Sequence, residues 1–267
     1  MWSGVSKPAL HPFARLTPDQ VLDALAAVGL DVDGRLSALS SYENRVYLAH
    51  LHDAPPVVAK FYRPNRWTEA QIREEHRFAQ QLAEQEVPMV APMCLQGDTL
   101  HWHAVDDELG FWFAVAARRG GRQPDCDDPE VLTWLGRFLA RLHGVGEQEH
   151  FVHRPELNLQ TLGWDSHRDL LASGLIDPAQ RAAWDAAAQQ ALSAVEEAMQ
   201  GSAPQRLRLH GDCHLGNVLW TPLEMPQGGP HFVDLDDART GPAVQDLWML
   251  VSTDARDQGW QWACLIE

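Results

Sequence analysis

Lysine is nearly absent from this chain. Only Lys7 and Lys60 are lysines among its 21 basic residues, and 37 acidic residues give the 267-residue chain a formal net charge of -16. A surface of that sign repels nucleic acid and anionic lipid, so we expect neither as a partner. An anionic ligand would need cations or a metal ion gathered at its own site.

Cysteines and long apolar runs are also scarce. The four cysteines, at positions 94, 126, 213 and 264, form no CxxC pair, which argues against a disulfide framework. No run of about 18 apolar residues is present, and residues 1–16 lack the apolar centre of a signal peptide. We therefore expect a cytoplasmic protein without a membrane segment. Its composition, 45% hydrophobic and 22% charged, is that of a globular chain.

The first 118 residues predict a small α+β lobe. Thr17 can cap a helix, and the turn residues 53–56 can join two strands as a hairpin. The expected elements are a helix from Thr17 to Gly29, strands at 46–51, 57–62 and 111–116, and a helix from Thr68 to Glu86.

The remaining residues, 119–267, predict a mainly helical lobe. Residues 118–128 are polar and rich in glycine and proline, which is typical of a linker. The expected elements are a helix from Asp128 to Gly144, a helix from Asp177 with an apolar stripe from Trp184 to Met199, and short strands near 207–209, 218–220 and 231–235.

Three oxygen-bearing side chains follow one another at informative spacing. Asp212 precedes Asn217 by five residues, and Asp234 ends an apolar run after the next turn. Phosphoryl transfer needs a carboxylate that orients the attacking hydroxyl and hard oxygen ligands for Mg²⁺. A loop with Asp and Asn beside a strand that ends in Asp supplies these groups together. Lys60, inside the apolar run VVAKFY, adds a compact cation.

These motifs resemble a known group of enzymes. The pattern HGDxxxxN followed by VDLD is similar to that of the aminoglycoside phosphotransferase and choline kinase branch of the protein-kinase-like fold. Further segments resemble the bacterial stress response kinase A family: SYENRVY (41–47), VVAKFYRP (57–64), EEHRFAQQL (74–82), GGRQ (120–123), HRP (153–155), LRLHGDCHLGN (207–217) and FVDLDDARTGPAVQDLWML (232–250). The resemblance covers essentially the whole chain.

The resemblance implies a bilobal α+β fold that binds ATP and Mg²⁺ in the cleft between residues 1–118 and 119–267. It implies that Asp212 is the catalytic base, that Asn217 and Asp234 are magnesium ligands, with Asp234 also catalytic, and that Asp246 braces the catalytic loop. Contacts to ATP are implied for Ser41, for Lys60 with Glu75 or its neighbour Glu74 as partner, and for the backbone near Ala114 and Ala116.

The function implied is that of a monomeric Ser/Thr protein kinase in bacterial stress response. Two alternatives stay open: a kinase of small alcohols from the same branch, and a nucleotide-binding scaffold without turnover. The chain departs from ordinary protein kinases because LSSYENRV stands where they carry a GxGxxG loop. The resemblance also implies that relatives continue for several tens of residues beyond the segment ending at Leu250.

Each candidate residue also has a structural interpretation. Asp212 and Asn217 are common in turns, and Lys60 could be an edge-strand cation whose ammonium group reaches water. Glu75 could belong to a solvated helix face, between Arg73 and Arg77. The intact set of Asp212, Asn217, Asp234 and Lys60 favours catalysis.

Three further groups lie close to the motif. His210 and His214 flank Asp212, but no third zinc ligand is obvious, so we expect them to pack or hydrogen-bond within the loop. Cys213 is expected to fill space. Asp236 would point the same way as Asp234 if strand alternation continues, and it is a secondary candidate for the site.

Overall fold

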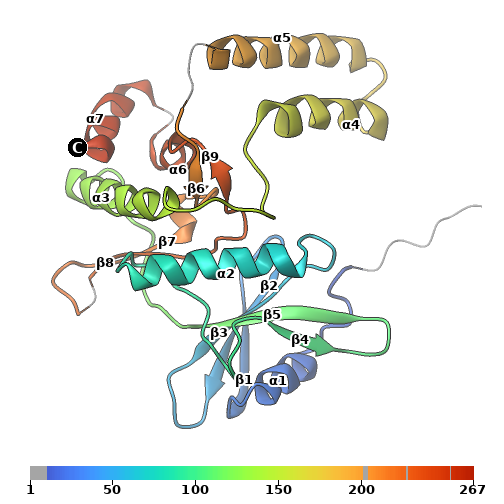
Figure 1. Cartoon of the computed structure of the whole chain (residues 1–267), viewed down its shortest axis with the longest axis vertical. Coiled ribbons are helices and arrows are strands. Elements are labelled where there is room, and N and C mark those ends of the chain that lie inside the picture. Colours follow the sequence, from blue (N-terminus) through green and yellow to red (C-terminus); the bar gives the residue numbers. More distant parts are fainter. Residues whose placement is uncertain (1–10, 201–203, 227, 253) are drawn as a thin grey trace, which may run out of the picture. The chain divides into compact units, whose positions relative to one another are not determined.

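The computed structural model describes residues 11–200, 204–226, 228–252 and 254–267. Lys7 and the other residues before position 11, in the segment expected to lack a signal peptide, lie outside the described residues. The chain divides into two compact units, each made of two stretches of sequence (Figure 1). The first unit comprises residues 1–122 and 219–236, and the second comprises residues 123–218 and 237–267. The assignment of an ATP-binding lobe to 1–118 and a catalytic lobe to 119–267 stays a prediction.

The first unit contains a five-stranded antiparallel sheet with strand order β1-β2-β3-β5-β4. The three predicted strands are confirmed as β2, β3 and β5, and β2 pairs with β3 as the predicted hairpin. Neither β1 nor β4 was predicted. The strand bounds are β1 (Val32–Leu39), β2 (Arg45–Leu51), β3 (Val57–Phe61), β4 (His101–Ala104) and β5 (Gly110–Ala117).

Two helices flank this sheet, α1 (Pro18–Ala27) and α2 (Glu69–Glu84) (Figure 1). Both begin where predicted. The hydroxyl group of Thr17 accepts a first-turn hydrogen bond as expected, and that of Thr68, for which no cap was predicted, does the same. The α1 side chains join the core formed by alternate residues of β3 and β5, such as Phe61 and Phe113. An α2 side chain, Ile72, instead packs in the cluster that contains Ala114. Since side chains alternate along a strand, the two helices cover opposite faces of the sheet.

A short hairpin from later in the chain belongs to the same unit. β7 (Val218–Thr221) pairs with β8 (Gly229–Phe232). Phe232 anchors β8, because its N–H donates to the carbonyl of Pro88 at 2.8 Å and its carbonyl accepts from the N–H of Val90 at 2.9 Å. The strand predicted at 231–235 therefore lies earlier in the chain, at Gly229–Phe232. Beyond β8 the chain turns, with Asp234 at a φ of +63°.

The second unit is mainly helical, as predicted. Asp128 caps α3, which runs two residues beyond the predicted end. Gly136 of α3 faces the backbone of Leu265, where a side chain would collide, so α3 and α7 pack closely. The elements are α3 (Pro129–Gly146), a π-helical turn η1 (Gln160–Asp165), α4 (Ser166–Ser173), α5 (Arg181–Gln200), β6 (Leu207–Leu209), a 3₁₀ turn η2 (Leu215–Asn217), β9 (Arg239–Gly241), α6 (Val244–Leu247), η3 (Trp248–Leu250) and α7 (Ala255–Ile266).

Helix α5 differs from its prediction. It begins at Arg181 rather than after Asp177, whose carboxylate accepts the N–H of Ala179 in a preceding turn. None of its residues is buried, so the predicted stripe does not face a core within the described residues. His167 of α4 stacks on Trp184 and links the two helices. In the part of the chain that the structure describes, no helix is long and apolar enough to cross a membrane.

Candidate functional site

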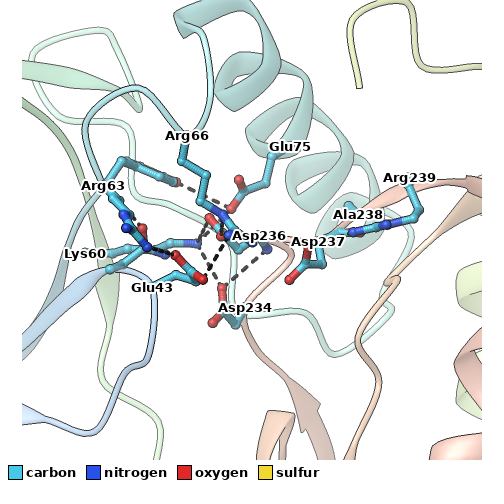
Figure 2. A network of polar contacts seen from close by, with 12 residues as sticks. Glu43, Lys60, Arg63, Arg66, Glu75, Asp234, Asp236, Asp237, Ala238 and Arg239 are labelled. Carbon is cyan, nitrogen blue, oxygen red and sulfur yellow. Dashed lines mark hydrogen bonds and ion pairs between the residues drawn. The ribbon is translucent and has the colours of Figure 1, made fainter. Parts of the chain in front are cut away.

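Lys60 lies among three carboxylates in the first unit (Figure 2). Its Nζ is 2.9 Å from Asp234 Oδ1, 3.1 Å from Asp236 Oδ1 and 3.2 Å from Glu75 Oε1. The Lys60 side chain is only 17% exposed. The structural interpretation of Lys60 as an edge-strand cation that reaches water therefore does not describe it. Its ammonium group lies between acidic side chains and neutralises their charge.

Local structure explains why these four residues meet. The side chains of β3 alternate, so Phe61 enters the core with α1 while Lys60 points to the face that α2 covers. Glu75 lies one turn after the buried Ile72 on the same side of α2. The turn after β8 then brings in Asp234 and Asp236, closed by a hydrogen bond from Asp236 N–H to Asp234 Oδ1 at 3.3 Å.

Asp236 joins the cluster for a reason other than the predicted one. Strand alternation was expected to place it beside Asp234, but the strand ends at Phe232 and the chain reverses instead. The premise was wrong, although both carboxylates do contact Lys60. Asp236 is buried, and its Oδ2 also accepts from Arg66 Nε at 3.1 Å.

The charges of this cluster shift the titration of its members. Burial by itself would lower the pKa of Lys60, but Asp234, Asp236 and Glu75 together raise it well above its ordinary value. Burial, followed by the charge of Glu75, raises the pKa of Tyr62 well above its ordinary value. Lys60 is therefore a permanent cation at neutral pH, and the Tyr62 phenol stays protonated and bonds His76 Nε2 at 2.8 Å.

A second layer of ion pairs supports the cluster and was not predicted. Glu43 bridges two arginines, with Arg63 Nη1 at 2.6 Å and Arg66 Nη1 at 3.2 Å (Figure 2). Asn44 ties the same loop to the end of β3, because its Oδ1 accepts from Arg63 N–H at 3.1 Å. The available signal was the position of Glu43, Asn44 and Arg63 inside the segments SYENRVY and VVAKFYRP.

The other ATP-binding candidates of this unit lie near Lys60 in the sheet. Ala114 is directly opposite Lys60 in the β3–β5 pair, and Ala116 is opposite Val58, so both alanines share the sheet face of Lys60. Ser41 lies just before the loop that carries Glu43 and Asn44. Their contacts with ATP stay predictions.

The loop of residues 210–217 in the second unit is held by a buried aspartate. Asp246 Oδ2 accepts the N–H of His210 at 2.9 Å and Asp246 Oδ1 accepts the N–H of Gly211 at 2.8 Å. His143 Nε2 lies 3.0 Å from Asp246 Oδ2. Asp246 is completely buried and holds the backbone of the loop, as the resemblance implied.

Asp212 lies at the exposed edge of that loop. Asn217 Nδ2 donates to the Asp212 carbonyl at 2.9 Å and to its Oδ2 at 3.3 Å. His214 Nδ1 accepts the N–H of Gly216 at 2.9 Å, which leaves Nε2 to carry the proton of the neutral ring, 3.6 Å from Asp212 Oδ2. Burial raises the pKa of Cys213 well above its ordinary value, so this thiol is a packing group, as expected.

Comparison with known proteins identifies the chain. Residues 35–263 match the phosphotransferase enzyme family. The chain belongs to this family. Stress response kinase A of Escherichia coli K12 is 44% identical to this phosphotransferase over 255 residues, which are 96% of the chain and 74% of that relative. A Salmonella typhimurium LT2 homologue, serine/threonine protein kinase RdoA, is 43% identical with the same coverage.

Solved structures confirm the predicted fold. The phosphotransferase matches the amicoumacin kinase hAmiN, solved in complex with AMP-PNP, Ca²⁺ and Ami, with a TM-score of 0.73 at 17% identity, over 95% of this chain and 77% of that one. It matches choline kinase LicA of Streptococcus pneumoniae with a TM-score of 0.60 at 14% identity, over 92% and 79%. The aminoglycoside phosphotransferase and choline kinase type of fold is thus established, while the roles of single residues remain predictions.

Gly211 is expected to be indispensable to this phosphotransferase. Its φ is +86°, and a Cβ there would collide with the carbonyl oxygen of Asp237. We expect Gly211→Ala to reduce the free energy of unfolding by about 2–4 kcal/mol, from the left-handed conformation and the overpacking together.

Gly144→Ala is the matched control for that substitution. Gly144 lies within α3 and has open space around its Cβ position, so the change is expected to stabilise the protein slightly, by about 0.5–1 kcal/mol. Urea unfolding of both variants measures the difference. Equal stability of the two variants would contradict the structure of the loop.

Proposed function

We propose that this phosphotransferase transfers the γ-phosphoryl group of ATP, with Mg²⁺, to a serine or threonine hydroxyl of a protein. It would act as a monomeric stress-response kinase in the bacterial cytoplasm. The names of its bacterial homologues support this acceptor and this role. The observation that carries the proposal is the Asp212 loop, in which the Asp212 carboxylate is 41% exposed while a buried one, Asp246, holds the backbone of the loop.

Asp212 has the task of the base. Its carboxylate would accept a hydrogen bond from the attacking hydroxyl, orient the oxygen toward the γ-phosphorus and take the proton as transfer proceeds. The two hydrogen bonds from Asn217 hold the carboxylate and its backbone in place. Positioning of this kind supplies much of the rate enhancement in phosphoryl transfer.

Lys60 has the task of meeting the nucleotide phosphates. A cation fixed by Glu75 at 3.2 Å is preorganised, so little conformational entropy is lost when it binds an anion. In this proposal Ser41 contributes a hydroxyl beside ATP, and the backbone at Ala114 and Ala116 receives the adenine. Asp234, now paired with Lys60, would exchange part of that ion pair for the metal.

Asn217 and Asp234 fit a magnesium ion by the chemistry of their oxygens. Mg²⁺ takes one or two protein carboxylates and completes its shell with phosphate oxygens and water. Asn217 uses its amide nitrogen for Asp212, so its Oδ1 is the ligand atom. When bound, Mg²⁺ neutralises charge on the transferred phosphoryl group.

Asp234→Asn is expected to weaken nucleotide binding in the presence of Mg²⁺ by roughly tenfold or more, and to change binding in EDTA much less. The variant loses a formal charge at the metal while its side chain keeps its size. Asp53→Asn, in an exposed turn of the same unit, is the control. Calorimetric titration with AMP-PNP, with and without Mg²⁺, measures both. An unchanged ratio of the two affinities would remove Asp234 from the metal site.

A kinase of small alcohols is the second candidate, and one cavity favours it. A half-open pocket of about 410 Å³ in the second unit is lined by residues that include His214, Trp248 and Trp262. The His214 ring that lines this cavity is also the ring beside Asp212. Its size and aromatic lining suit a small acceptor.

The decisive experiment is transfer from γ-labelled ATP with Mg²⁺, offered to a generic protein acceptor and to a panel of small amino alcohols and sugars. Asp212→Asn serves as the inactive control. We expect label on serine or threonine of the protein. Label on small alcohols alone would select the second candidate. ATP binding without any transfer would leave the scaffold without turnover.

A further inference from the structure

A pocket rich in arginine lies in the first unit, apart from Lys60. It is a shallow pocket, open to solvent, with a volume of about 600 Å³. The pocket lies between the five residues that follow β5 and the β7–β8 hairpin. All of its lining residues belong to the first unit. The lining residues are Arg118, Arg119, Gly120, Gly121, Arg122, Trp220, Thr221, Pro222, Pro226 and His231. The segment includes part of GGRQ, which the proposed kinase chemistry leaves without a role.

The backbone that carries these arginines is fixed. Arg122 and Trp220 exchange two backbone hydrogen bonds, of 3.0 and 2.7 Å, so the segment is paired to β7. Gly121 permits that approach, because its φ is +149° and a Cβ would lie 2.9 Å from the Cβ of Leu219. The positive φ and the close approach to Leu219 both require glycine at this position, so the segment can lie directly against β7. Arg118 and Arg122 thus project from an anchored backbone.

The charge of the pocket is opposite to that of the protein. Three of the 21 basic residues gather within five positions of a chain whose net charge is -16. Among the described residues that line the pocket, none is acidic. Burial lowers the pKa of His231, and the nearby positive charge of Arg119 lowers it further. His231 is therefore a neutral polar group at neutral pH, and the arginines supply the positive charge.

The pocket is distinct from the Lys60 cluster. Lys60 lies opposite Ala114 in the β3–β5 pair, and β5 continues three residues further, to Ala117. At roughly 3.3 Å per residue, the first arginine lies about 13 Å further along the chain than Ala114. None of the residues that surround Lys60 is part of the lining. A phosphate held by Lys60 would not contact this pocket at the same time, although the pocket begins only two residues beyond Ala116, where the adenine is proposed to bind.

We propose that the arginine pocket binds a second phosphate group, carried by a small phosphorylated ligand or by a phosphorylated side chain, at a site separate from that of the nucleotide being consumed. Guanidinium groups match phosphate in geometry and in charge, and clusters of them recognise phosphoserine and phosphothreonine. The apolar walls of Trp220, Pro222 and Pro226 would contact the part of the ligand that carries the phosphate.

The test is isothermal titration with three probes: inorganic phosphate, a short phosphoserine peptide and the same peptide without phosphate. Each is measured on the wild-type chain, on Arg118→Gln/Arg122→Gln and on the control Arg35→Gln/Arg256→Gln. The control arginines are 70% and 88% exposed, and each pairs with a neighbouring aspartate. Thermal unfolding of all three proteins verifies their folding. Glutamine keeps a polar side chain of similar length while it removes the charge.

We expect phosphate and the phosphopeptide to bind the wild type and the control alike, and to bind the pocket variant at least roughly tenfold more weakly, since charge-assisted hydrogen bonds are lost. If the phosphopeptide binds more tightly than phosphate, the ligand of the pocket is a phosphorylated side chain. If the two bind equally, the ligand is a small phosphorylated molecule. Equal binding of both peptides to the wild type, or of phosphate to both double variants, would overturn the proposal.

A kinetic measurement distinguishes this site from the nucleotide site. The KM for ATP of the pocket variant is expected to stay within about twofold of the wild-type value, since the arginines lie outside the Lys60 cluster. A KM that rises in parallel with the dissociation constant for phosphate would make the pocket part of the nucleotide site and refute the proposal. The calorimetry needs no turnover, so its result stands even where the proposed kinase activity fails.

Discussion

Replacing Asp212 with asparagine is expected to lower the rate of phosphoryl transfer by about 10²–10⁴-fold, the usual contribution of a general base. Asparagine cannot take the proton of the acceptor hydroxyl, yet it has the size of the carboxylate and can still accept the hydrogen bond from Asn217 Nδ2. The affinity for nucleotide should therefore change little. Single-turnover transfer and calorimetric titration with AMP-PNP measure the two effects separately.

Asp169→Asn on α4 is the control for this substitution, because its carboxylate belongs to the same unit and is 76% exposed. It should be fully active. The role of Asp212 as base would be lost if Asp212→Asn kept more than about one tenth of the wild-type rate. An equal loss of rate and of nucleotide affinity would instead indicate that Asp212 acts in binding.

Replacing Lys60 with methionine is expected to harm both stability and activity. It leaves Glu75 and Asp236, which are 6% and 7% exposed, without their shared cation. Removing one partner of a buried ion pair costs about 3–5 kcal/mol. The rate of transfer should fall by roughly 10²–10³-fold, as when one preorganised group for developing charge is removed. Arg35→Met, at an exposed surface ion pair, is the control and should change neither.

The stability difference at Lys60 should depend on pH in a defined direction. The folded protein raises the pKa of Lys60, so the stabilisation is fully present below the unfolded value of 10.5 and is lost only as pH rises through the higher folded value. In Lys60→Met, Glu75 loses its cation and Asp236 keeps only its ion pair with Arg66. Protonation in acid removes the uncompensated negative charge, so the variant should approach the wild type as the pH falls. A difference that stays constant from pH 8 to pH 4 would contradict this charge cluster.

Elements with strong local signals could be predicted from the sequence. The cap at Thr17 marks the start of α1, and the runs VYLAHL and VVAKFY define the central hairpin. β1 was missed because Gly34 and Arg35 interrupt a segment whose side chains are mostly exposed. β4 was missed because it is four residues long and is stabilised by its partner β5 rather than by its own pattern.

The candidate site was predictable where chemistry is encoded in spacing. Lys60 with Glu75, and Asp246 beneath the loop of Asp212, follow from the motifs and their resemblance to kinases. The left-handed turn at Asp234 has only a weak local signal, because aspartate adopts a positive φ more often than most residues but still only in a minority of cases. The Glu43 bridge depends on tertiary packing between segments that the sequence pattern treats separately.

The first unit consists of two stretches of sequence that are separated by part of the second unit. The residues around Lys60 are therefore synthesised at different times. Asp234 follows Lys60 by 174 residues, and residues 123–218 of the other unit are made in between. At about 5–20 residues per second, a ribosome needs roughly 10–35 s to travel from one to the other. In that interval Glu75 is the only one of the three carboxylates around Lys60 that has been synthesised. The set can be completed only after β8 and its turn have been made, so the Lys60 cluster is completed late in translation.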